Sequence, residues 1–249
     1  MAEIWEHPFG YASLKIERAK DHISNIEKRL LSSPNHYGPR LYVDAQTGKQ
    51  FLHYSLTDRT LTQEISLTVG DAIHNLHSAL DIAWCATYCA LVSSADSKFR
   101  KFPVYPKEER RNFESKMRGK MPSSSALFDF IVNRVKPYKG GDTDITSLHE
   151  LDIDDKHRLL IPMLTVTSLD GVELQHEDGR IERLDITLIR PNFYRKMVPL
   201  ETEIKHHGKA RFRITFREGD FLQGEEVIPT LLRFTAKANR IVRILQRMK

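Results

Sequence analysis

Cysteine is scarce in this chain, which has only Cys85 and Cys89 among its 249 residues. Two cysteines four positions apart on one expected helix cannot build the disulfide framework of a small secreted protein. A reducing compartment is their natural setting, and we expect both to be small core residues rather than metal ligands or nucleophiles.

Long apolar runs are also missing. The longest, residues 82–92, is interrupted by Thr87 and is too short to cross a bilayer. The first residues, 1–6, lack the basic and apolar regions of a signal peptide. We therefore expect a cytoplasmic protein that has no membrane partner.

Several catalytic signatures are absent from the sequence. It has no glycine-rich phosphate loop and no G-x-S-x-G elbow, which argues against P-loop nucleotide hydrolysis and serine-hydrolase chemistry. No metal-ligand spacing such as H-E-x-x-H occurs, so we assign no metal and no cofactor. Six side chains are still chemically competent as metal ligands: His74, His77, Asp81, His149, Asp152 and His157.

Charge is almost missing from residues 72–95, where Asp81 is the only formally charged side chain. A helix of this composition, expected over 70–91, is apolar or small nearly all round and should be buried on most sides. On that helix His74, Ser78, Asp81 and Cys85 share a narrow arc, with His77 at its edge. A buried carboxylate is costly unless it is paired, so another segment must supply partners for Asp81 and His74.

The expected source of those partners is a second polar cluster, within a helix predicted over 145–160. His149, Asp152 and Lys156 share one face of that helix at spacings of three and four. We expect Asp81 to pair with Lys156 or Arg158. Two interpretations stay open: a binding or catalytic site, and a buried polar network that only fixes helix packing. The candidate catalytic residues are His74, Asp81, His149, Lys156, His157 and Arg158.

The order of the expected elements indicates an α+β protein, because helices and strands are segregated and no βαβ alternation occurs. Residues 1–161 are predicted to form a mainly helical core with a β-hairpin insertion. Residues 162–249 are predicted to form a mainly antiparallel β region, closed by a basic helix that packs back on the core. The expected helices are 11–31, 70–91, 108–117, 123–135, 145–160 and 229–248. The expected strands are 40–44, 49–57, 163–167, 172–176, 181–189 and 210–217, with a hairpin turn at 169–171.

Basic residues concentrate near the C-terminus of a chain whose net charge is +5. From Val227 to Lys249 there are six bases and no acid. A face of this kind is usually only solvated, but it also suits contact with nucleic-acid phosphates. The candidate nucleic-acid-binding residues are Arg211, Arg213, Arg217, Arg233, Lys237, Arg240 and Arg247.

Several separated pieces of the sequence resemble a widespread family of uncharacterised bacterial proteins. Residues 70–81 are similar to its motif G-D-x-x-H-N-x-R-S-A-L-D, and residues 148–160 to L-H-E-L-x-x-x-D-K-H-R-L-L. Phe102-Pro103 matches a short F-P segment that lies between these motifs. The chain departs from the family pattern at His77, where the family has Arg, and at Ile82, where it often has His.

A more distant similarity is to the HEPN superfamily of RNases and nucleotide-binding proteins, whose signature is Arg, four to six residues, then His. Arg29 and His36 fit that spacing. The resemblance implies a metal-independent RNase of a defence or toxin type, with RNA or DNA as partner.

Three functions therefore compete at the level of sequence, and whether the protein is an enzyme stays open. The first is the nucleic-acid-associated protein, with His74, His149 or His157 as acid or base and Lys156 or Arg158 next to phosphate. The second is a metal-dependent hydrolase. The third is a non-catalytic binding or scaffold protein, and a homodimer is open as an alternative to a monomer.

Overall fold

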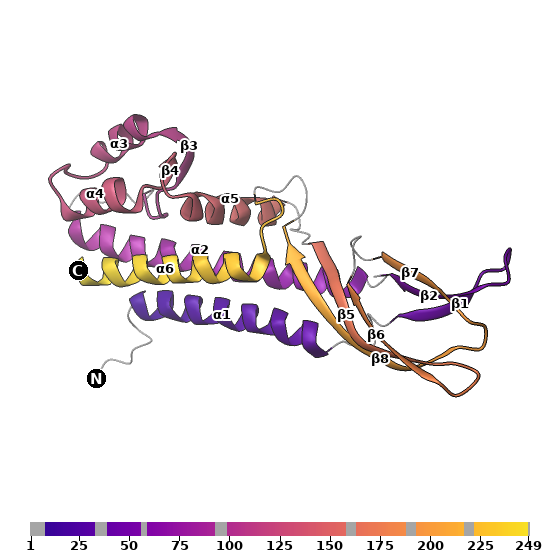
Figure 1. The fold of residues 1–249 in the computed structure, drawn as a ribbon. Coiled ribbons are helices and arrows are strands. Elements are labelled where there is room, and N and C mark those ends of the chain that lie inside the picture. The colour runs from indigo at the N-terminus through magenta and orange to yellow at the C-terminus, as the bar shows by residue number, and fades with distance from the viewer. Residues whose placement is uncertain are drawn as a thin grey trace, which may run out of the picture.

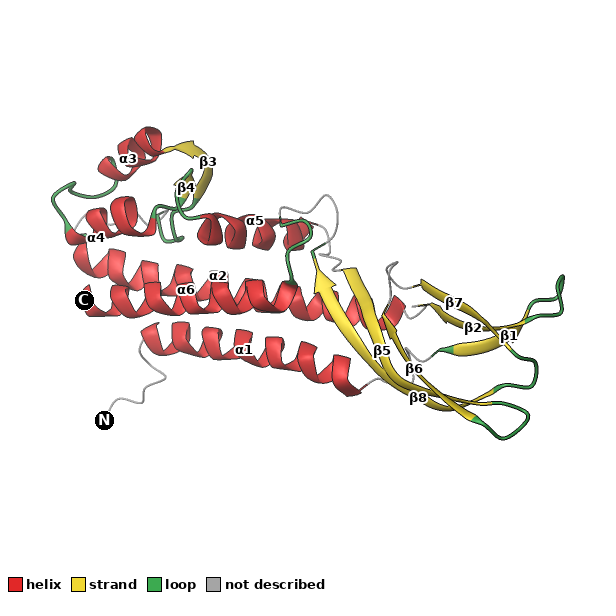
Figure 2. Cartoon of the chain, viewed as in Figure 1, coloured by secondary structure: helices red, strands yellow, loops and turns green. Residues whose placement is uncertain are grey.

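A computed structural model of the chain describes residues 8–32, 39–55, 59–92, 99–157, 163–187, 193–216 and 222–248. Over these ranges the helices gather in one part of the molecule and most strands extend from its end (Figures 1 and 2). The two larger sheets are antiparallel, so the predicted α+β class is confirmed.

Three long helices form the bundle: α1 (Pro8–Ser32), α2 (Arg59–Leu91) and α6 (Val227–Met248). Figure 1 shows α1 running antiparallel to α2 and α6. Apolar residues spaced three or four apart on α1 are buried, as are the apolar residues on the face of α6 that faces away from its bases. In the part of the chain described, no helix combines the length and the apolarity needed to cross a bilayer.

Helix α2 is longer than predicted, because it begins well before the expected start at Gly70. The additional turns bury Leu61, Ile65 and Val69, a spacing of four that keeps one face on the core. Gly70 therefore lies inside the helix, at the point where α5 approaches it. A Cβ atom at this position would lie 2.4 Å from the Asp155 carboxylate oxygens. The glycine therefore marks a close helix contact and not a helix end.

A smaller layer covers the bundle on the side away from α1 (Figure 1). It consists of β3 (Tyr105–Glu109), α3 (Arg110–Arg118), α4 (Ala126–Asp129), the π-helix η3 (Phe130–Val135), β4 (Tyr138–Lys139) and α5 (Thr143–His157). The hydroxyl of Ser125 caps α4 by accepting from the Phe128 backbone N–H at 3.1 Å. Helix α5 packs against α2 and α6 and carries the second polar cluster to them.

The strands form two three-stranded sheets. One has the order β1 (Arg40–Val43), β2 (Gln50–Ser55), β7 (Phe193–Val198). The other has the order β6 (Ile181–Thr187), β5 (Met163–Gln175), β8 (Glu203–Thr215). Strand β7 was not predicted, and it pairs with the N-terminal hairpin. Elements from before and after residue 161 therefore share a sheet, and α6 likewise packs against α1 and α2.

The hairpin turn expected at 169–171 is wrong. Strand β5 continues through this segment, with a shift of its register against β6 between Leu169 and Val172. Gly171 has φ 72°, so the Asp-Gly pair serves a bulge within a strand and not a turn between two strands. The chain reverses five residues later, where the His176 N–H donates to the Arg180 carbonyl at 2.9 Å.

Candidate functional site

The buried acid of the polar cluster is Asp152, on α5. Its side chain is only 2% exposed. Oδ1 lies 3.1 Å from Nδ1 of His74, and Oδ2 accepts from Nζ of Lys156 at 2.5 Å. Two polar partners from two helices therefore meet one buried carboxylate, as the cost of burying an isolated charge requires.

His74 connects this carboxylate to the surface of α2. Because a carboxylate only accepts hydrogen bonds, Nδ1 of His74 carries the proton that faces Asp152. Nε2 is then an acceptor, and it lies 3.4 Å from Oγ of Ser78, one helical turn away. About half of the His74 side chain is exposed, so its unprotonated nitrogen is not sealed in the core.

A second imidazole contact lies beside the first. Nε2 of His77 is 3.0 Å from Nδ1 of His149. Nδ1 of His77 lies 3.5 Å from Oδ2 of Asp152 and 3.6 Å from Oδ2 of Asp81. With its proton on Nδ1, His77 accepts from His149, which leaves Nε2 of His149 unprotonated.

Burial keeps both of these imidazoles neutral. It lowers the pKa of His77, even though Asp81 and Asp152 act in the opposite direction. Burial, with His77 as neighbour, lowers the pKa of His149 to about 4. At neutral pH His149 therefore has no acidic proton to deliver.

The expected pair between Asp81 and Lys156 does not form, because Lys156 lies on Asp152 instead. The Asp81 side chain is 29% exposed and accepts from the Phe102 backbone N–H at 2.8 Å. A carboxylate near water with a backbone donor needs no cation. The composition of α2 located the cluster, but it identified the wrong acid as the buried one.

Of the two other candidates, one is described by the structure. His157 is exposed at the last residue of α5, and the cluster contacts found among the described residues do not include it. Arg158 lies outside the described residues, and so do Arg217 and His36 of the HEPN-like spacing. Of the five catalytic candidates that the structure describes, His74, Asp81, His149 and Lys156 are brought together.

Three residues outside the candidate list complete the site. Asp152 is its centre, His77 bridges two carboxylates and a second imidazole, and Ser78 faces His74. All three lie on or beside the two polar faces that the sequence predicted, and this position could have identified them as site residues. The sequence could not predict how α5 packs against α2, and this packing is what encloses Asp152 and leaves Asp81 near water.

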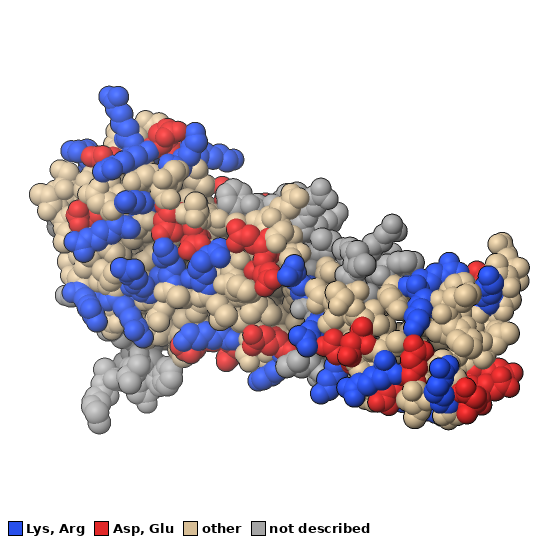
Figure 3. Space-filling model, viewed as in Figure 1, with Lys and Arg blue, Asp and Glu red and all other residues tan. Residues whose placement is uncertain are grey.

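The predicted basic surface is largely ion-paired where it is described. Nε of Arg211 lies 2.6 Å from Asp170 and Nε of Arg213 lies 3.0 Å from Glu226. On α6, Arg233 pairs with Asp144 and Glu225, at 2.7 and 2.9 Å, and Lys237 pairs with Asp142 at 2.5 Å. Acids remote in sequence thus offset much of the charge, and Figure 3 shows red side chains among the blue ones on the face in view.

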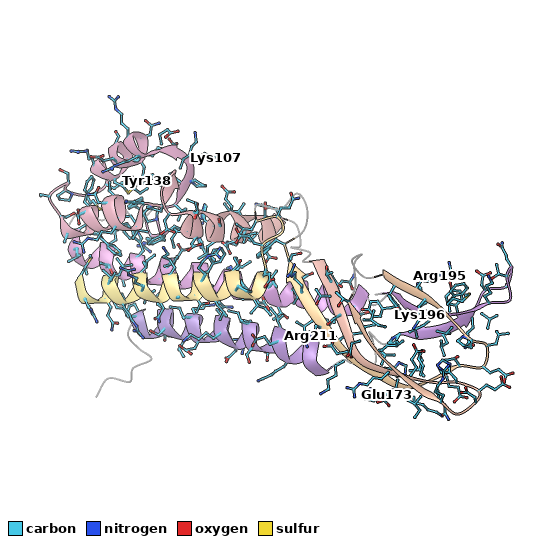
Figure 4. All side chains as sticks on the ribbon, in the orientation of Figure 1. Lys107, Tyr138, Glu173, Arg195, Lys196 and Arg211 are labelled. Carbon is cyan, nitrogen blue, oxygen red and sulfur yellow. The ribbon has the colours of Figure 1, made fainter. Side chains whose placement is uncertain are left out.

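The basic residues that the structure describes are also spread over several elements. Figure 4 shows Arg211 on β8, where the strands meet the bundle, and Arg195 and Lys196 farther out on β7. Helix α6 ends on the side of the bundle away from the strands (Figure 1), with Arg247 in its last turn and Arg240 about two turns earlier. Neither takes part in an ion pair with another described residue.

Metal ligands do not converge in the described ranges: no group of three or more His, Cys, Asp or Glu side chains there could hold a metal ion. The six chemically competent side chains are thus not arranged as a ligand set. Protein-family models, curated proteins and solved structures likewise give no match to the chain. The role of the site is therefore inferred from its own geometry.

Proposed function

We propose that this protein is a metal-independent, RNA-cleaving enzyme in which His74 is the general base. The observation that carries the proposal is that a buried carboxylate, Asp152, fixes the Nδ1–H of a half-exposed imidazole and leaves Nε2 free to take a proton. A base oriented by a third group is the arrangement that proton abstraction requires. The proposal agrees with the HEPN resemblance and with a cytoplasmic location.

RNA suits this site because it brings its own nucleophile. His74 would accept the proton of a ribose 2′-hydroxyl through Nε2 as that oxygen attacks the adjacent phosphorus. The bond from phosphorus to the 5′-oxygen breaks, and the leaving oxygen takes a proton from Lys156 or water. The half-exposed ammonium of Lys156, bound to the same carboxylate, would offset negative charge on the phosphate.

The geometry favours His74 as the general base over the other two candidate histidines, His149 and His157. The low pKa of His149 makes it a weak base and removes it as an acid at pH 7. His157 makes none of the cluster contacts among the described residues. Of these three histidines, His74 is therefore the one that combines a carboxylate partner with a half-exposed side chain.

A second candidate is a non-catalytic scaffold, which one observation favours. Asp152 is enclosed and paired, and it joins α2 to α5. A buried polar network of this kind can serve only to fix the packing of two helices. In that case removal of His74 would change stability and nothing else.

The test is cleavage of labelled single-stranded RNA in EDTA by the wild type, His74→Ala and His157→Ala. We expect cleavage by the wild type and by His157→Ala, and a rate lower by roughly 10²–10⁴ for His74→Ala. DNA of the same sequence should survive, because it lacks the 2′-hydroxyl. The result would favour a scaffold over an enzyme if the wild type leaves RNA intact and His74→Ala melts at a lower temperature than the wild type.

A further inference from the structure

A second polar feature lies at the other end of α5. A cavity of about 150 Å³ opens between η3, α6 and the residue that precedes α5. Its polar wall is formed by Arg134, Asp142, Lys237 and Arg240, and its apolar wall includes Phe130 and Ile241. A cavity of this volume accommodates a molecule as large as benzene, and therefore also a phosphate group.

The wall of the cavity is held by a tight turn. Lys136 ends η3 with φ 55°, and its carbonyl accepts from the Asp142 N–H at 2.8 Å. Gly141 is required between them, because a Cβ atom there would lie 2.1 Å from the Lys136 carbonyl oxygen. Asp142 then accepts from the Ile145 N–H through Oδ1 and from Lys237 through Oδ2, at 3.2 and 2.5 Å. This side of the cavity is preorganised by hydrogen bonds.

The charges that line the cavity do not cancel. Three cations face one carboxylate, and Lys237 already pairs with that carboxylate. Arg134 bonds to Asp129 through Nε at 3.2 Å, a contact that leaves its two terminal nitrogens for another ligand. Arg240 has no ion-pair partner among the described residues. With Asp129 counted, Arg240 is left without an acid among these residues and Arg134 keeps its terminal nitrogens, and both side chains end in planar groups that suit oxyanions.

We propose that this cavity binds a phosphate monoester group. Such a group carries about −1.5 to −2 charges at pH 7 and three acceptor oxygens, so it can bind the two guanidinium groups of Arg134 and Arg240 at once. Guanidinium groups bind its oxygens in pairs, and the apolar wall keeps water from one side of the contact. The group can belong to free phosphate, to a nucleotide or to the 5′ end of an RNA.

This site is separate from the Asp152 cluster. Asp142 and Asp152 are ten residues apart along α5, or roughly 15 Å. The binding of phosphate therefore does not depend on the proposed cleavage of RNA. His74→Ala should bind phosphate as the wild type does, so the two proposals fail in different measurements.

The experiment is isothermal titration of the full chain with inorganic phosphate, a nucleoside 5′-monophosphate, and one RNA oligonucleotide with either a 5′-phosphate or a 5′-hydroxyl. The variants are Arg240→Gln and the matched control Arg243→Gln, an exposed residue on the same helix that does not line the cavity. We expect Arg240→Gln to weaken binding about tenfold or more and Arg243→Gln to leave it unchanged. The probe bound most tightly identifies the source of the phosphate.

Two outcomes overturn the proposal. In one, none of the phosphate-bearing probes binds the wild type. In the other, both variants weaken binding equally, or the 5′-hydroxyl RNA binds as tightly as the phosphorylated one, which indicates diffuse attraction to a basic surface. Circular dichroism of each variant checks that it is folded; because Arg240 is exposed and has no ion-pair partner among described residues, we expect no loss of structure.

Discussion

Nδ1 of His74 lies 3.1 Å from Oδ1 of Asp152, a contact between residues 78 positions apart in the chain. One partner is enclosed in the core and the other is half-exposed, so the pair links the interior of the α2–α5 contact to its surface. Because the carboxylate accepts only, it determines which nitrogen of the imidazole carries the proton. The proposed cleavage and the packing of the two helices would therefore depend on the same contact.

Asp152→Asn should separate those two roles. The amide keeps the size of the side chain, but it can present its NH₂ group to His74 and then stabilises the other tautomer. We expect RNA cleavage to fall by about 10² or more, and the free energy of unfolding to fall by about 1–3 kcal/mol. Urea denaturation and single-turnover cleavage measure the two effects, with Glu150→Gln on the same helix as control. Loss of stability at full cleavage rate would contradict the assigned role of Asp152.

Ser78→Ala tests which hydroxyl loses its proton to His74. If the nucleophile belongs to RNA, the Ser78 hydroxyl is dispensable and the cleavage rate should stay within about threefold of the wild type. The contact at 3.4 Å is at the limit of a hydrogen bond, so little stability should be lost. A rate as low as that of His74→Ala, together with labelling of Ser78 by a fluorophosphonate, would instead make Ser78 the nucleophile.

The sequence predicted the elements better than it predicted their contacts. The period of the apolar residues in α1 and α6 identified both helices and their buried faces, because each pattern is local. Strand β7 carries no such pattern, and it is a strand because β2 lies beside it. In the same way, the sequence indicates that a helix starts at Gly70, whereas the lack of a side chain there serves the close approach of Asp155 on α5.

The candidate site shows the same limit. Two polar faces on apolar helices predicted that His74 would find a partner on α5, and it does. The sequence could not show that Asp152 is enclosed while Asp81 is near water, because burial depends on how the helices pack and not on the local pattern. The sequence of α6 likewise contains no acid, and the acids that pair with Arg233 and Lys237 lie outside that helix, at Asp142, Asp144 and Glu225.

The stability of the protein should fall in mildly acidic solution because of His149. Its pKa is about 4 in the folded protein, below the ordinary value of 6.5, so the unfolded chain binds a proton more readily. The contribution of the neutral His149 ring to the free energy of unfolding is complete above pH 6.5. It declines as the pH falls from 6.5 toward 4. Because the ring is partly in water, we expect a loss of about 1–2 kcal/mol over this range.

Thermal melting of the wild type, His149→Gln and His157→Gln between pH 7.5 and 4 measures this effect. Glutamine does not titrate, so the difference in melting temperature between the wild type and His149→Gln should shrink as the pH is lowered. His157→Gln removes an exposed imidazole from the same helix and is the matched control. Parallel curves for the wild type and His149→Gln would show that His149 does not titrate differently in the folded and unfolded chain.

Asp81 should stabilise the segment that follows α2, by accepting the Phe102 N–H at 2.8 Å. Phe102 is buried and lies edge-on against Trp84, with 5.8 Å between ring centroids, so this hydrogen bond holds a core side chain in place. Asp81→Ala leaves a backbone donor without its acceptor, and we expect a loss of about 1–2 kcal/mol. Asp81→Asn keeps an oxygen acceptor and should lose less than half of that. Hydrogen exchange at the Phe102 amide should be faster in the alanine variant alone. Equal losses in both variants would show that the charge of Asp81 beside His77, and not its hydrogen bond, stabilises the fold.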